Sequence, residues 1–163
     1  MISSRLAGRD SLLFVYGTLR PFADIEMAKW LRNAARYLGP ATVRGRLYDL
    51  GSYPGMIAAR GRAERVVGDV YRVTNPRVLR VLDRYEAGAR GKARFMRDRC
   101  EVELDRGGRK TAWAYRYCYS VVTAPRIASG DYRLHCRDRF GPTGSGTRPR
   151  LEIRAAGVSI MPA

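Results

Sequence analysis

Near its amino terminus the chain reads Leu12-Leu13-Phe14-Val15-Tyr16-Gly17-Thr18-Leu19-Arg20-Pro21. The apolar run over residues 12–15 is typical of a buried strand, because a strand covered on both faces does not alternate polar and apolar residues. Gly17 has no side chain, so backbone N–H groups in the following turn can approach an anion closely, and Thr18 adds a hydroxyl. The stretch predicts that Tyr16, Gly17, Thr18 and Leu19 form the floor of a small-molecule pocket. The alternative is an ordinary turn after a strand.

The residues that follow alternate between helix and strand patterns. Residues 23–35 carry apolar side chains at helical spacing and acidic residues near their start, which predicts a helix. Residues 37–51 predict bent strands, because glycines interrupt the apolar residues. Residues 52–55 predict a turn, and residues 66–73 predict a further strand.

The clearest helix is predicted over residues 75–87. Asn75 is a suitable N-cap, Pro76 suits the first helical position, and Gly88 suits the C-terminal end. Between these signals one apolar face repeats at helical spacing. Its members are Val78, Leu79, Val81, Leu82 and Tyr85.

The second half of the chain is dominated by strand patterns. Residues 95–104 and 111–117 alternate around a Gly-Gly turn and predict a hairpin. Residues 121–134 are interpreted as an irregular continuation with a turn at residues 129–131. The resulting order of elements predicts an α+β fold with a curved or closed, mostly antiparallel sheet.

We expect one globular domain over residues 12–140. The 163 residues and the 45% hydrophobic content are sufficient for a buried core. Residues 1–11 are predicted to be a frayed N-terminus. Residues 141–150 contain only Gly, Pro, Ser, Thr and Arg, so residues 141–163 are predicted to be a linker and C-terminal tail.

The formal net charge of the chain is +16, and only Lys29, Lys92 and Lys110 among its 31 basic residues are lysine. A compositional preference for arginine and a polyanionic partner, above all nucleic acid, are both consistent with this balance. The arginines are scattered, and no run of five basic residues occurs. The pattern therefore favours no specific nucleic-acid partner.

The cysteine and hydropathy patterns indicate a cellular compartment. Cys100, Cys118 and Cys136 are an odd number without CxxC spacing, which predicts free thiols in a reducing compartment. No apolar stretch reaches the ~18 residues of a membrane span. We therefore expect a cytoplasmic protein with no membrane partner.

Two carboxylates near the end of the predicted 75–87 helix are candidates for acid–base chemistry. Asp83 and Glu86 are three residues apart, so they lie near one helix face. The negative end of the helix dipole and partial burial both favour a raised carboxyl pKa. The alternative is that both side chains are solvated and pair with Arg80, Arg84 or Arg90.

His135 is the only histidine, which argues against a catalytic triad or a two-histidine metal site. We interpret it as a structural or surface residue. If this segment is extended, Cys136 faces the opposite way. No dinucleotide-binding or P-loop glycine pattern occurs, so the sequence does not support nucleotide-phosphate chemistry.

Taken together, four blocks of sequence resemble the γ-glutamylcyclotransferase-like (AIG2-like) family. The first block is the stretch from Leu13 to Pro21 quoted above. The others are Gly45-Arg46-Leu47-Tyr48-Asp49-Leu50-Gly51-Ser52-Tyr53-Pro54-Gly55, Val67-Gly68-Asp69-Val70-Tyr71 and Leu82-Asp83-Arg84-Tyr85-Glu86. The resemblance covers about residues 12–134 and implies a small mixed, mostly antiparallel β-barrel flanked by helices.

Enzymes of this family release 5-oxoproline from γ-glutamyl amines or peptides, without a metal or cofactor. The resemblance implies that the loop Tyr16, Gly17, Thr18 and Leu19 holds the γ-glutamyl group and that Glu86 is the general acid/base. It also implies a substrate-binding role for Tyr53, Pro54 and Gly55. Two other hypotheses remain: a non-catalytic module of the same fold that binds a small carboxylate, and a basic protein associated with nucleic acid.

Overall fold

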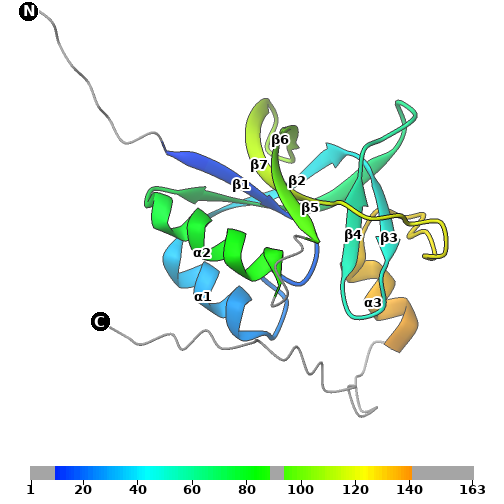
Figure 1. Cartoon of the computed structure of the whole chain (residues 1–163). Coiled ribbons are helices and arrows are strands. Elements are labelled where there is room, and N and C mark those ends of the chain that lie inside the picture. Colours follow the sequence, from blue (N-terminus) through cyan, green and yellow to red (C-terminus); the bar gives the residue numbers. More distant parts are fainter. Residues whose placement is uncertain (1–9, 89–93, 141–163) are drawn as a thin grey trace, which may run out of the picture.

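Figure 1 shows the computed structural model of the chain, which describes residues 10–88 and 94–140. Most of the predicted frayed N-terminus and all of the predicted tail, residues 141–163, lie outside these ranges. The elements in chain order are β1 (Ser11–Val15), α1 (Glu26–Ala34), β2 (Arg36–Arg44), β3 (Arg46–Asp49), β4 (Pro54–Ile57), β5 (Arg65–Val73), α2 (Pro76–Ala87), β6 (Phe95–Leu104), β7 (Arg109–Tyr117) and α3 (Tyr132–Phe140).

Five strands close into a barrel in the order β1-β5-β2-β6-β7. Strand β1 pairs with β7 in parallel, through Leu13 and Trp113, and the other barrel pairs are antiparallel. Strands β3 and β4 form a separate antiparallel hairpin. The predicted fold class, a small mixed and mostly antiparallel barrel flanked by helices, is confirmed.

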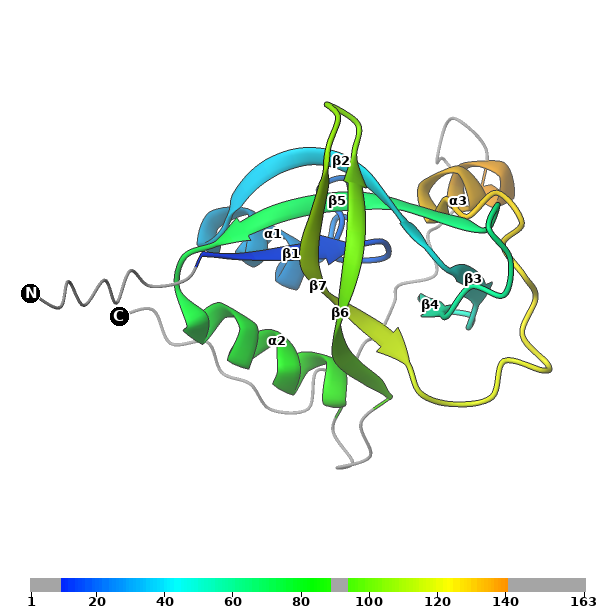
Figure 2. The same cartoon turned by 90° about the horizontal axis from the view of Figure 1, so that it is seen from above.

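Strand β1 is buried on both faces, as its continuous apolar run predicts. Phe14 points into the barrel and packs with Val70 and Val102. Leu13 and Val15 belong to a second core, together with residues of α1 and α2. In both views these two helices lie away from α3, which stands beside the β3–β4 hairpin (Figures 1 and 2).

The predicted 75–87 helix is α2, and its end signals are confirmed. The Asn75 side chain accepts a hydrogen bond from the backbone N–H of Arg77 at 3.0 Å. Gly88, at the C-cap, has a φ of 72°, in the left-handed region that favours glycine. The helix therefore ends with Ala87, directly after Glu86.

Of the two predicted turns, one requires correction. The turn predicted over residues 52–55 lies earlier, because Leu50 N–H donates to the carbonyl of Tyr53 at 3.0 Å and β4 begins at Pro54. The turn predicted at residues 129–131 is present, since Gly130 N–H donates to the carbonyl of Ile127 at 2.9 Å, and it leads directly into α3 at Tyr132. The Asp131 carboxylate accepts from the N–H groups of Arg133 and Leu134, at 2.9 and 3.4 Å, and so caps α3.

Helix α3 was not predicted, and the extended geometry considered for His135 and Cys136 is wrong. The segment has no apolar stripe at helical spacing, because basic residues are interspersed along it. It packs on the barrel core mainly through Tyr132, with Cys136 partly buried against the same core.

Candidate active site

The predicted pocket loop is fixed to two strands by Tyr16. The buried Tyr16 hydroxyl donates to the carbonyl of Tyr115 in β7 at 2.7 Å. It also accepts from the backbone N–H of Met56 in β4 at 3.2 Å. The loop therefore has a fixed position at the end of β1 and next to the β3–β4 hairpin.

Gly17 and Pro54, which the sequence places in two separate blocks, are in direct contact. A Cβ at Gly17 would lie 2.7 Å from Pro54 Cγ, much closer than side chains normally approach. Gly55 is equally enclosed, because a Cβ there would lie 2.7 Å from Leu50 Cδ1. Gly17 allows the loop to pack directly on Pro54, and Gly55 allows β4 to pack closely against Leu50 and Tyr117.

A Gly17→Ala substitution is expected to displace the loop or Pro54. We expect a loss of stability of about 1–3 kcal/mol, because overpacking forces backbone shifts in a well-packed site. Urea unfolding measures this loss. Gly61→Ala is the control, since a Cβ at Gly61 would meet no atom within 4 Å. Equal stabilities of the two variants would contradict the close contact of Gly17 with Pro54.

The other predicted substrate-binding residues have different surroundings. Leu19 is buried in the core between β1 and the two helices, so only its backbone is available to a ligand. Thr18 is partly exposed. The Tyr53 hydroxyl accepts a hydrogen bond from Arg94 Nη1 at 2.6 Å, and its ring packs edge-on against Phe95.

Glu86, near the C-terminal end of α2, has an unusual environment for a carboxylate. Its side chain is only partly exposed, and burial raises its pKa to about 8. Within the described residues no ion pair compensates its charge. A carboxyl group with such a pKa is available both to accept and to donate a proton near neutral pH.

The charge of Glu86 reaches the pocket loop. Burial, and next the nearby Glu86, raise the pKa of Tyr16 well above its usual range. Burial and Glu86 also raise the pKa of Tyr85 to about 12. The charge of Glu86 therefore acts on Tyr16, at the start of the predicted pocket loop.

Asp83 is engaged differently from Glu86. Its Oδ1 accepts from the Tyr115 hydroxyl at 2.8 Å and lies 3.0 Å from Arg97 Nε. Its Oδ2 accepts from Arg97 Nη2 at 3.1 Å. The partner of Asp83 is therefore Arg97, not Arg80 or Arg84, and Arg90 lies outside the described residues. Asp83 fixes α2 against β6 and β7, which positions Glu86 one turn later.

The sequence of the chain matches a known protein family. Residues 13–134 match the sequence model of the family described as gamma-glutamyl cyclotransferase, AIG2-like. The chain belongs to this family. The matched region includes the Tyr16 loop, the β3–β4 hairpin and Glu86.

Individual relatives of this γ-glutamyl cyclotransferase family member were found by sequence and by structure. Gamma-L-glutamyl-butirosin B gamma-glutamyl cyclotransferase from Niallia circulans is 32% identical over 107 residues, which span 64% of this chain and 65% of that protein. Gamma-glutamylcyclotransferase family protein YtfP from Escherichia coli (strain K12) is 33% identical over 121 residues, which span 74% of this chain and 94% of that protein. A crystal structure of an AIG2-like protein from Mus musculus superposes with a TM-score of 0.63 at 22% identity, and covers 88% of this chain and 98% of that one.

Three charged residues to which the sequence analysis assigned no role, Arg20, Asp69 and Asp131, form a network that connects the loop after β1 to β5 and α3. Buried Arg20, from the loop after β1, donates to Asp69 Oδ2 at 2.7 Å and to Asp131 Oδ1 at 2.8 Å. Asp69 Oδ1 also accepts from the Tyr37 hydroxyl at 2.8 Å. One sequence signal could have identified this network: a charged residue inside an apolar stretch, such as Asp69 in β5, is expected to have a buried partner. This network holds the pocket loop against the barrel and against α3.

His135 also has structural partners in this γ-glutamyl cyclotransferase fold. Its Nε2 lies 2.9 Å from Asp49 Oδ2, and Arg139 donates to the same carboxylate oxygen. Burial opposes ionisation of Asp49, but hydrogen bonds from His135 and Gly51 N–H lower its pKa overall. These contacts join α3 to the end of β3, in agreement with the structural interpretation of His135.

The structure describes residues 10–88 and 94–140. Within these ranges, no group of three His, Cys, Asp or Glu side chains is arranged to hold a metal ion. No helix in the same ranges is long and apolar enough to cross a membrane.

Proposed function

We propose that this chain is a γ-glutamyl cyclotransferase that converts a γ-glutamyl amine or peptide into 5-oxoproline and a free amine. The observation that carries the proposal is the partly buried Glu86 carboxyl group, whose pKa is raised to about 8 and whose charge also raises the pKa of Tyr16. A solvated glutamate in an ion pair would not support the proposed reaction, because its carboxyl pKa would not be raised. Membership of the family supports the same reaction class.

The reaction is an intramolecular acyl transfer. The α-nitrogen of the substrate attacks its own γ-carbonyl carbon, and the amide bond to the leaving nitrogen then breaks. A pocket that holds the glutamyl chain in a folded conformation gives these two groups a high effective concentration. The proton lost by the attacking nitrogen is needed by the leaving nitrogen, so one group can accept it and return it.

Glu86 is suited to this proton transfer. Its pKa of about 8 is much closer to that of an amine than the pKa of an ordinary glutamate is, so a proton moves from the substrate's α-ammonium group to Glu86 at a smaller free-energy cost. An ordinary glutamate, with a pKa near 4.5, would be too weak a base. Glu86 in its ionised form accepts the proton, and in its protonated form donates it to the departing amine.

The loop supplies the second part of the proposed site. Backbone N–H groups of Gly17, Thr18 and Leu19 are the candidates for binding the α-carboxylate or the developing oxyanion. The Tyr16 hydroxyl is engaged by Met56 and Tyr115, so its proposed role is to position the loop. Pro54 and Gly55 are the candidates for the adjoining wall, and the contact of Pro54 with Gly17 supports this role.

A substrate panel tests this proposal. The full-length chain is incubated with γ-glutamyl conjugates of neutral, acidic and basic amines, and 5-oxoproline is measured by mass spectrometry. We expect stoichiometric release of 5-oxoproline and amine from at least one conjugate. Binding of conjugates without 5-oxoproline formation would instead identify a non-catalytic module of the same fold and contradict the proposal.

A further inference from the structure

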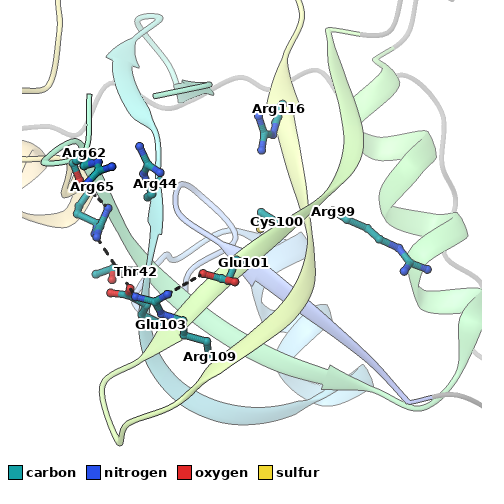
Figure 3. Close-up of a pocket in the computed structure, with 10 residues that line it drawn as sticks. All are labelled: Thr42, Arg44, Arg62, Arg65, Arg99, Cys100, Glu101, Glu103, Arg109 and Arg116. Atoms are coloured by element: carbon teal, nitrogen blue, oxygen red, sulfur yellow. Dashed lines mark hydrogen bonds and ion pairs between the residues drawn. The ribbon is translucent and has the colours of Figure 1, made fainter. Parts of the chain in front are cut away.

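A basic concavity of about 400 Å³ lies on the β2, β6 and β7 side of the barrel (Figure 3). Six of its ten lining residues are arginines, and two are glutamates. Glu86 and the Tyr16 loop are not among them. The lining residues are Thr42, Arg44, Arg62, Arg65, Arg99, Cys100, Glu101, Glu103, Arg109 and Arg116.

The concavity forms where two strands of the barrel separate. Strand β2 pairs with β6 only from Ala41 to Val43, opposite Leu104 to Val102. Beyond this pairing the end of β2 continues alongside β5, whereas β6 continues alongside β7. Arg44 is at the end of β2 and Arg116 is on β7, so the opening between the strands has arginines on both sides (Figure 3).

Three of the six lining arginines, Arg65, Arg109 and Arg116, pair with carboxylates, and the partner of Arg116 is Asp98 at 3.3 Å. Glu101 and Glu103 both pair with Arg109, at 3.5 and 3.0 Å. Arg65 lies 3.9 Å from Glu103. Over residues 10–88 and 94–140, neither Arg44 nor Arg62 forms an ion pair with a carboxylate. The concavity therefore keeps a positive excess.

One wall of the concavity is ordered by its own hydrogen bonds. Arg44 Nη2 donates to the carbonyl of Gly61 at 3.3 Å, and Arg65 Nη1 donates to the carbonyl of Arg62 at 3.1 Å. These contacts hold the loop between β4 and β5, so that Arg44, Arg62 and Arg65 gather on the same side (Figure 3). On the facing side, Arg116 Nε is buried and lies 3.3 Å from Asp98 Oδ2, so this guanidinium already has one carboxylate partner.

We propose that this concavity is a second binding site, for one compact polyanion that carries at least two phosphate or carboxylate groups. Arginine matches both groups, because its planar guanidinium donates two parallel hydrogen bonds to them. Arg44, Arg62 and Arg65 bind one end of the ligand. The site goes beyond the proposed cyclotransferase function and does not depend on it.

A small ligand fits these observations better than a nucleic acid. The volume is within the range of small-molecule sites, about 300–1,000 Å³. Glu101 and Glu103 line the same opening, and their negative charges disfavour a phosphate backbone that continues along β6. The positive side chains surround a hollow and do not form a long stripe.

Calorimetric titration with two probes tests the site. Tripolyphosphate and citrate are titrated separately into the full-length protein at about 150 mM salt, where interactions between distant surface charges are screened. We expect saturable binding with one ligand per chain. The probe that binds more tightly shows whether phosphate or carboxylate groups are preferred.

A charge-matched pair of variants locates the binding. The Arg44→Gln/Arg62→Gln variant is expected to weaken binding about tenfold or more, because it removes two charge-assisted contacts. Arg77→Gln/Arg80→Gln removes the same net charge from the exposed face of α2 and is expected to leave affinity unchanged. Equal weakening in both variants, or no saturable binding of either probe, would overturn the proposal. Affinity for single-stranded oligonucleotides that grows with their length would also overturn it, in favour of a nucleic-acid surface.

Discussion

Glu86→Gln is expected to lower the rate of 5-oxoproline release by on the order of 10²–10⁴-fold, the usual contribution of general acid–base catalysis. The amide side chain has nearly the same shape as the carboxyl group but cannot accept and return a proton. Substrate affinity is expected to change much less than kcat, because the loop N–H groups are unaltered. Release of 5-oxoproline under saturating substrate is the measurement.

The variant is expected to keep its fold. With a pKa of about 8, Glu86 is mostly protonated at pH 7, so a neutral glutamine resembles the form already present. Glu26→Gln is the matched control, because Glu26 has a 91% exposed side chain on α1 and pairs with nearby Lys29. If Glu86→Gln and Glu26→Gln have equal rates, Glu86 is not the acid/base.

Arg20→Met is expected to destabilise the fold by about 3–5 kcal/mol, the typical effect of removing one partner from a buried ion pair. The side chain of Asp69 is only 5% exposed and would lose its charged donor, Arg20 Nε. Asp131, at the start of α3, would lose the hydrogen bond that it accepts from Arg20 Nη1. Urea unfolding at neutral pH measures the change in the free energy of unfolding.

Arg72→Met provides the comparison for this effect. Arg72 is also on the barrel, but it is 44% exposed and lies 3.9 Å from its partner Asp10, so we expect a change within about 1 kcal/mol. Adding Asp69→Asn to Arg20→Met is expected to recover part of the loss, because the uncompensated buried charge disappears. A loss for Arg20→Met no larger than that for Arg72→Met would refute the structural role of Arg20.

Local sequence signals were sufficient for several elements. Strand β1 was predicted by an unbroken apolar run, and α2 was predicted by Asn75, Pro76 and Gly88 together with its apolar face. The β6–β7 hairpin was predicted by alternation around a Gly-Gly turn. In each case the signal lies within a few residues of the structure that it specifies.

Long-range contacts and weakly patterned segments could not be predicted in the same way. The contact of Gly17 with Pro54 and the pairing of Arg20 with Asp131 depend on how the barrel closes. Helix α3 has no apolar stripe, and its cap at Asp131 resembles an ordinary turn signal. The carboxyl pKa of Glu86 depends on burial by tertiary packing, so the sequence suggested its direction but not its extent.

The pH dependence of kcat/KM for 5-oxoproline release tests the role of Glu86 most directly, since this parameter reports the pKa of the free enzyme's base. Only the ionised carboxylate accepts a proton, and burial raises the pKa of Glu86 to about 8. We therefore expect kcat/KM to rise about tenfold per pH unit between about pH 6 and pH 7 and to level off near pH 8. A profile that is already flat above pH 6, as for a glutamate with an ordinary pKa, would contradict the proposed mechanism.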